Sequence, residues 1–359
     1  MKNIILAGFL FLSLVGYTSA QTVNNKTITW EASDSNGKTR LTVKGEVGIS
    51  EDDQRIISLS KDGAINYEHR SDKLQITSGY DGNLIYRFNK KEKTVLDAHE
   101  EQILKKAVQM MINHGINAET RAKRLYAKSG RDGVLQELPK LQGDYARQKY
   151  LSALLSLGMS TPEMTDVLNN IGQYLKSDYY NAELLTNVMT IYLLDDATSK
   201  AYLNVVRNMK SDYYQYSILQ KMMKNKLNSE QMVEVVDIVK TMKSDYYQSE
   251  VYKNLLKQAA FGETAFNETL DLVFSMKSDY YKTEIIKNLL KRQLTESDWT
   301  KLISYADKID SDYYQCELIL NIADKMPEND VLKRGLSEAA KAIKSEYYYG
   351  KVMRKIAAS

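Results

Sequence analysis

Hydrophobic and polar residues alternate with a period of two along residues 22–93. Ile28 and Trp30 begin this pattern, and it recurs through Leu41 and Val43. Asn-Gly or Asp-Gly dipeptides, which favour tight hairpin turns, separate the apolar runs at 36–37, 62–63 and 81–82. Because this alternation places the apolar side chains of a strand on one face, we expect an antiparallel β meander of about six strands.

The spacing of apolar residues becomes helical between residues 94 and 142, with Ile103 and Val108 on one stripe. We expect three helices in this connector, at 97–115, 117–130 and 132–141. His99 and Glu100 match the first half of the His-Glu-x-x-His zinc motif, but Ile103 stands where the second ligand is required. We therefore expect no metal site here and no cofactor elsewhere in the chain.

Residues 143–359 contain an internal repeat with a spacing of 33 or 34 residues. Five copies begin with Ser-Asp-Tyr-Tyr, while a degenerate first copy begins at Gly143 and the last copy begins with Ser-Glu-Tyr-Tyr at Ser345. Apolar residues recur seven, eight and eleven positions after the Ser, which is one stripe of a helix. Each copy has room for two helices, and stacking of such pairs buries the faces that a lone pair leaves exposed.

These patterns predict an α+β protein in which a small N-terminal antiparallel β meander precedes an α-helical repeat superhelix. The repeat period matches that of tetratricopeptide proteins, but their signature residues are not evident. We therefore expect a tetratricopeptide- or HEAT-like αα solenoid outside both families. The predicted organisation is a signal peptide at 1–20, a β domain at 22–93, a helical connector and cap at 94–142, and repeats at 143–359.

The first two residues of each motif are typical of a helix start. A Ser hydroxyl is a common N-cap that accepts from first-turn N–H groups, and an Asp beside it favours the positive end of the helix dipole. The predicted caps are Ser177, Asp178, Ser211, Asp212, Ser244, Asp245, Ser278, Asp279, Ser311 and Asp312.

The first tyrosine of each motif and a Glu six positions after the Ser form a candidate interaction surface. Its residues are Tyr179, Tyr213, Tyr246, Tyr280, Tyr313, Glu183, Glu250, Glu284 and Glu317. One interpretation is a ladder that grips an extended peptide or a glycan. The other is structural, with tyrosine rings packing between repeats and the Glu side chains bonding to neighbours. Repetition in every unit favours the structural interpretation, because a binding site more often varies.

Composition and motifs argue against several classes of function. The 359 residues include 49 basic and 46 acidic side chains, so no charge excess indicates nucleic-acid binding. Thirteen of the 26 tyrosines are motif tyrosines, which makes the tyrosine excess mainly a repeat signature. Cys316 is the one cysteine, and the alternatives for it are a small core residue, a reactive thiol or an intermolecular disulfide. No catalytic triad, phosphate-binding loop or distinctive carboxylate pair indicates an enzyme.

The first 20 residues have the three parts of a secretory signal peptide. Lys2 supplies the positive charge, residues 4–15 are almost wholly apolar, and small residues at 18–20 form a cleavage site. No cysteine lies near that site, so we expect no lipoprotein anchor. No later stretch is apolar enough to span a bilayer. We therefore expect an exported protein, periplasmic or extracellular, with no transmembrane segment in its mature chain.

The layout resembles a family of exported bacterial proteins, mostly of unknown function, with a β-rich front and Ser-Asp-Tyr helical units. Similar segments occur in regions attached to membrane metallopeptidases of the β-lactam-sensor type. The matching stretches are Ile28-Thr29-Trp30-Glu31, Leu41-Thr42-Val43-Lys44-Gly45-Glu46 and Gly115-Ile116-Asn117-Ala118-Glu119-Thr120-Arg121-Ala122, followed by the repeats. The resemblance implies an accessory or sensory role in the cell envelope. Because the chain has no His-Glu-x-x-His motif, the peptidase activity does not transfer.

We therefore expect a non-enzymatic scaffold that binds a protein partner in the cell envelope. The alternative is a protein that binds a glycan or peptidoglycan, since tyrosine faces beside carboxylates suit sugar rings.

Overall fold

The computed structural model describes residues 18–24, 27–35, 37–192, 194–258 and 263–358. Most of the predicted signal peptide lies outside these residues. Its last three residues begin the first described strand, β1 (Thr18–Asn24). The chain divides into two compact units, residues 1–159 and residues 160–359. Each unit is described by itself below.

The first unit contains an antiparallel sheet of seven described strands and a separate pair of short strands. In order across the sheet, the seven strands are β1, β2 (Thr27–Asp34), β3 (Gly37–Lys44), β6 (Ala64–His69), β7 (Asp72–Ser78), β8 (Leu84–Phe88) and β9 (Lys91–Lys93). The separate pair is β4 (Val47–Ile49) and β5 (Ile56–Leu59). The antiparallel meander is confirmed, but its strands are more numerous than the six expected. Strands as short as β4 and β9 contain too few residues to show a period of two.

The register of the sheet aligns its apolar residues in a row across five strands. Trp30 pairs with Leu41, Leu41 with Tyr67, Tyr67 with Leu74, and Leu74 with Phe88. All five side chains are buried in one core. Cross-strand neighbours on one face contact each other directly, so this row is the basis of the packing between strands.

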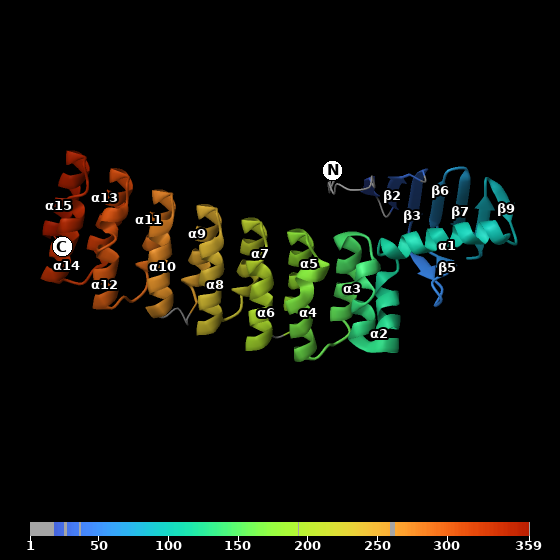
Figure 1. The fold of residues 1–359 in the computed structure, drawn as a ribbon. Helices are drawn as coiled ribbons and strands as arrows, with labels where there is room; N and C mark the ends of the chain where they lie inside the picture. Colours follow the sequence, from blue (N-terminus) through green and yellow to red (C-terminus); the bar gives the residue numbers. More distant parts are fainter. Residues whose placement is uncertain (1–17, 25–26, 36, 193, 259–262, 359) are drawn as a thin grey trace. The chain divides into compact units, whose positions relative to one another are not determined.

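One long helix, α1 (Ala98–Asn113), covers the buried face of the sheet (Figure 1). Ile103, Val108 and Met111 of α1 belong to the same core as the strand residues. Asp97 caps the helix in a reciprocal capping box with Glu100, which explains why the helical pattern begins at this point. The predicted apolar stripe of this helix is confirmed.

The remaining helices of the first unit are α2 (Ala118–Leu135), the 3₁₀ turn η1 (Leu138–Lys140) and α3 (Gly143–Leu155). Ser129 and Gly130 are non-helical within α2, and Gly130 has a φ of +61°. The glycine therefore interrupts the helix where the sequence predicts a stop. The chain resumes the helix after this kink, so the third predicted helix is the second half of α2 followed by η1.

The second unit is an array of paired helices. Its helices are α4 (Thr161–Tyr174), α5 (Asp178–Ile191), α6 (Asp196–Arg207), α7 (Asp212–Met222), α8 (Ser229–Thr241), α9 (Asp245–Leu255), α10 (Glu263–Ser275), α11 (Asp279–Leu289), α12 (Glu296–Ile303), α13 (Asp312–Lys325), α14 (Asp330–Ala340) and α15 (Glu346–Ala358), with a 3₁₀ turn η2 (Ala306–Lys308). From α5 onward, each odd-numbered helix begins with the repeated motif and packs against the next odd-numbered helix. Among the even-numbered helices, α4, α6, α8 and α10 pack against one another in succession, as do α12 and α14, which gives two layers of stacked helices (Figure 1).

The buried stripe of the odd-numbered helices explains this stacking. Val251, Tyr252 and Leu255 of α9 are fully buried, as are Ile285 and Ile286 at the equivalent positions of α11. The predicted positions seven, eight and eleven are therefore the helix positions that build the core. The fold is a β meander followed by an αα solenoid.

Candidate interaction surface

The Asp of the repeated motif joins each repeat to the next. The carboxylate of Asp178 accepts from the backbone N–H groups of Lys210 and Ser211, both at 2.8 Å. Asp212 binds Lys243 and Ser244 in the same way, at 2.8 and 2.7 Å. The carboxylates of Asp245, Asp279 and Asp312 also accept from the start of the following motif, at 2.7 to 3.2 Å. We name these contacts the Asp clamps.

The Asp clamps correct one detail of the predicted caps. Ser211, Ser244, Ser278 and Ser311 stand at the N-cap position, but their side chains make no capping hydrogen bond. The Ser backbone N–H is bound by the Asp of the preceding repeat instead. In the last repeat, by contrast, the Ser345 hydroxyl accepts from the Tyr348 N–H at 3.5 Å. The Asp of the motif therefore forms its hydrogen bonds with the following repeat, and the Ser side chain of these four motifs does not cap its own helix.

The motif tyrosines form one continuous row of ring contacts, which we name the tyrosine ladder. Within a motif, the rings of the first and second tyrosines are edge-on, with centroids 5.0 to 5.2 Å apart. The first ring also contacts the second ring of the next repeat, with centroids 6.1 to 6.2 Å apart. Edge-to-face pairs at these distances are favourable. The ladder extends without a break from Tyr179 to Tyr348.

The two tyrosines of a motif differ in exposure. The first tyrosines, Tyr179, Tyr213, Tyr246, Tyr280 and Tyr313, are 42 to 52% exposed. The second tyrosines, such as Tyr247 and Tyr281, are half-buried. The first tyrosine therefore both packs against a neighbouring repeat and faces solvent. The ring contacts support the structural interpretation, and the binding interpretation stays a prediction.

The predicted Glu residues lie on the same helices, about one turn after the tyrosines. Glu250 pairs with Lys253 at 2.8 Å, and Lys287 bridges Glu284 and Glu317 of adjacent repeats at 3.5 and 3.6 Å. These pairs are partly exposed, so each contributes little to stability. Glu183 is exposed in the first complete repeat. The row is therefore largely neutralised by lysines of the same layer.

A buried Gln four positions after the Ser is a structural residue that the sequence analysis missed. The Gln248 side-chain amide donates to the carbonyls of Val239 and Met242 at 3.2 and 2.9 Å. Gln215 and Gln315 donate to carbonyls of even-numbered helices or their ends in a similar way. These contacts add a donor to carbonyls near helix ends, where intrahelical partners become fewer. The recurrence of Gln at one repeat position is the signal that could have revealed it.

Cys316 is a small buried residue of α13. Burial raises the pKa of its thiol, Lys351 opposes this shift, and Glu317 adds to it. A raised pKa leaves little of the nucleophilic thiolate at neutral pH. Of the three alternatives for this residue, the structure favours a core residue.

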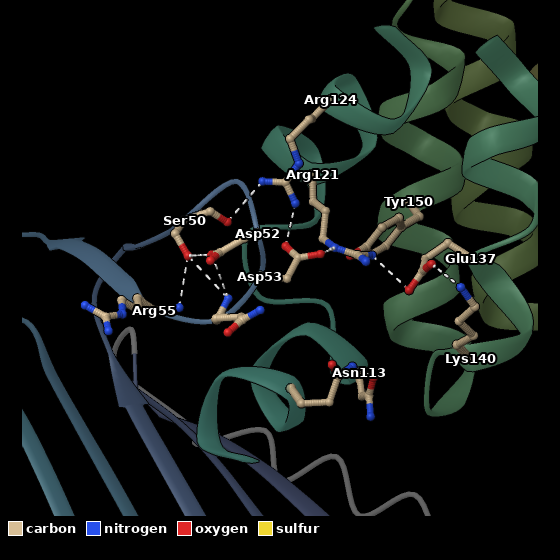
Figure 2. Close-up of polar contacts among 12 residues, drawn as sticks. Ser50, Asp52, Asp53, Arg55, Asn113, Arg121, Arg124, Glu137, Lys140 and Tyr150 are labelled. Carbon is tan, nitrogen blue, oxygen red and sulfur yellow. Dashed lines mark hydrogen bonds and ion pairs between the residues drawn. The ribbon is translucent and has the colours of Figure 1, made fainter. Parts of the chain in front are cut away.

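The first unit contains a buried charge cluster that the sequence analysis did not single out (Figure 2). Arg121 of α2 donates from Nε to Asp53 Oδ2 at 2.8 Å, and its Nη1 lies 3.0 Å from Glu137 Oε1. Nη1 also donates to the Tyr150 hydroxyl at 3.1 Å. Arg124 forms a second ion pair with Asp53.

This charge cluster connects the turn between β4 and β5 to the helices α2 and α3 of the same unit. Arg121 and Glu137 are both less than 10% exposed, and each is paired. A buried charge without its partner is strongly unfavourable, so the pairing holds the turn in place. Arg121 lies within residues 115–122, one of the stretches that carry the family resemblance. That resemblance is the sequence signal that could have pointed to Arg121.

Comparisons with family models, curated proteins and solved structures found no match to the chain. Within the described part of the chain, no three His, Cys, Asp or Glu side chains are grouped so as to hold a metal ion. Among the same residues, no helix has both the length and the apolar character needed to cross a bilayer.

Proposed function

We propose that the protein is a non-enzymatic, exported interaction scaffold whose contact surface is the tyrosine ladder. The observation that carries this proposal is the exposure of the first tyrosines. Twelve large hydrophobic residues are exposed in the described part of the chain, and six of them are first tyrosines of the ladder: the five named above and Tyr347 of the last repeat. Contiguous exposed aromatic residues are typical of protein-binding surfaces, because a tyrosine buries a large area and loses little side-chain entropy.

The spacing of the ladder supports an extended partner. Successive first tyrosines are separated by one ring contact of about 6 Å and one of about 5 Å. A polyproline II segment has three residues per turn and advances by about 3.1 Å per residue, so its residues three apart lie on one face and span a similar distance. A partner segment lying along the ladder could therefore place one side chain against each repeat.

Export also supports a partner in the cell envelope. The basic n-region, apolar segment and small residues of 1–20 remain the basis for this part of the proposal. The family resemblance supports an accessory or sensory role in the same compartment.

The test compares the full chain with a Tyr213→Ala/Tyr246→Ala/Tyr280→Ala variant in affinity capture from an envelope extract. The control variant is Lys224→Ala/Lys257→Ala/Lys291→Ala, which changes exposed residues near the other end of the same three helices. We expect the tyrosine variant to lose partners that the control retains. Circular dichroism checks that both variants are folded. Identical partners for all three folded proteins would refute the role of the ladder.

The second candidate function is binding of a glycan or peptidoglycan. It is favoured by the position of acidic groups beside the rings. Burial raises the pKa of Tyr214, and the neighbouring Tyr213, Tyr179, Asp178 and Glu183 add to this shift. An exposed ring of the ladder, such as Tyr213, is suited to stack on a sugar, and the exposed Glu183 carboxylate is suited to accept from the sugar hydroxyls. This function predicts retention on insoluble cell-wall polysaccharide, and elution of the chain in the unbound fraction would rule it out.

A further inference from the structure

The tyrosine ladder has a chemical property that is independent of any binding partner. Each first tyrosine contacts a second tyrosine of the following repeat, as Tyr213 contacts Tyr247 and Tyr246 contacts Tyr281. These pairs are far apart in sequence but have centroids 6.2 Å apart. Every ring along the array therefore has another phenol ring in contact with it.

Exposure makes these phenols accessible to oxidants. About half of the surface of Tyr213, Tyr246 and Tyr280 is open to solvent. A phenol that loses an electron also loses its proton, and a solvent-facing hydroxyl releases that proton to water. A ring that has been oxidised can then exchange its unpaired electron with the next ring, because contact distances favour electron transfer. Two tyrosyl radicals formed at different rings of the ladder can thus move by such exchanges until they lie on two rings in contact.

We propose that the tyrosine ladder is a site of oxidative cross-linking between successive repeats. The oxidant is a peroxide used by a peroxidase, and the product joins the first tyrosine of one repeat to the second tyrosine of the next. Each ring gives up one electron and its phenolic proton. A carbon–carbon bond forms between the two carbons ortho to the hydroxyls, and the hydrogens displaced there return to the oxygens. The pair loses two hydrogens in total, and one hydrogen peroxide becomes two waters.

Such a link has a structural consequence that a disulfide cannot supply in this chain. Cys316 is the one cysteine, and it is buried. A bond between Tyr246 and Tyr281 closes a loop of about one repeat. Closing a loop of this size constrains the unfolded chain, as a disulfide does. Oxidation is therefore expected to raise the Tm of the repeat region.

The experiment treats the full chain with hydrogen peroxide and horseradish peroxidase, then isolates the monomer and maps its cross-linked peptides by mass spectrometry. We expect links between Tyr213 and Tyr247 and between Tyr246 and Tyr281, each lighter by two hydrogens. Their yield should not depend on protein concentration. Tyr80 is fully exposed in the first unit and serves as an internal reference. A link between the Tyr80 residues of two molecules appears in the dimer fraction, and its yield should rise with concentration.

Two comparisons decide the outcome. The Tyr246→Phe variant keeps the ring but removes the phenol, so it should lose the links of this residue while the Tyr280–Tyr314 link persists. Tyr252→Phe, which changes a buried tyrosine outside the ladder, should leave the pattern unchanged. In the chain unfolded in guanidinium chloride, at the same concentration, ladder links should form a much smaller share of all the tyrosine cross-links in the monomer; the share is compared because the denaturant also slows the peroxidase. An equal share in the unfolded chain, or no ladder links in the folded monomer, would overturn the proposal.

Discussion

Removal of one Asp clamp should destabilise the contact between two adjacent repeats, which we call a joint. In the Asp245→Ala variant, the backbone N–H groups of Lys277 and Ser278 lose an acceptor that lies 3.1 and 2.7 Å away. Hydrogen bonds to charged groups contribute about 1.5–3 kcal/mol. Because a single, partly exposed carboxylate oxygen of Asp245 accepts both bonds, the two together contribute about 1.5–2 kcal/mol here. The loss of a negative charge near the start of α9 adds about 0.3–1 kcal/mol. We therefore expect a local destabilisation of about 2–3 kcal/mol.

Native-state hydrogen exchange measures this effect at the joint itself. Repeat arrays open locally, so a global unfolding curve does not isolate one joint. A destabilisation of about 2–3 kcal/mol corresponds to exchange that is about 30-fold to 150-fold faster at the Ser278 amide. Amides of α5 and α7, which precede the joint, should exchange at nearly unchanged rates.

The matched control is Glu250→Ala on the same helix. Glu250 is a carboxylate of similar size whose partner is Lys253, one turn further along α9. Such a pair contributes about 0.2–0.5 kcal/mol, so exchange at Ser278 should change by about twofold at most. If Asp245→Ala accelerates the Ser278 amide no more than Glu250→Ala does, the clamp does not hold the joint and the reasoning is refuted.

Three further predictions concern single residues. Arg121→Met leaves Asp53 and Glu137 without their buried partner, and urea denaturation should show a loss of about 3–5 kcal/mol in the first unit; a loss below about 1 kcal/mol would contradict the charge cluster. Burial lowers the pKa of His114, although its hydrogen bond to the Met110 carbonyl opposes this. The His114 imidazole therefore binds a proton more readily in the unfolded chain than in the folded one. The stability contributed by neutral His114 is fully present above the unfolded pKa of about 6.5 and is lost as the pH falls below that value. The Tm of His114→Asn should accordingly vary less between pH 7.5 and pH 5 than that of the parent chain. Cys316 should react with a thiol reagent far more slowly in the folded chain than in guanidinium chloride, and equal rates would show that its burial is wrong.

The main elements of both units follow from local patterns. The alternation around Ile28 and Trp30 predicts strands, and the repeated positions seven, eight and eleven predict buried helix faces, as Val251 and Leu255 confirm. Such patterns are readable because a strand and a helix each place every second, third or fourth residue on one face. Of the strands that the sequence analysis missed, β5 and β9 are too short to display a period, whereas β1 overlaps the end of the predicted signal peptide.

The candidate surface is only partly readable in the same way. The spacing of the motifs shows that Tyr213 and Tyr246 occupy equivalent places, but it leaves open whether their rings are buried. The structure places them half-exposed, in contact with a tyrosine of the next repeat. The exposure of a ring depends on the distance between stacked helices, and no single helix contains that information.

The sequence by itself determined where most of the helices and strands of this protein lie and that its repeats must stack, because periodic apolar positions have to be buried. Only the tertiary structure decided which contacts the repeated motif makes. Asp212 bonds to backbone groups 31 and 32 residues away, and Arg121 meets Asp53 across 68 residues. A carboxylate binds whichever donors the packing brings within about 3 Å. Its partners are therefore a property of the assembled fold, and the local pattern around the Asp is equally compatible with a simple helix cap.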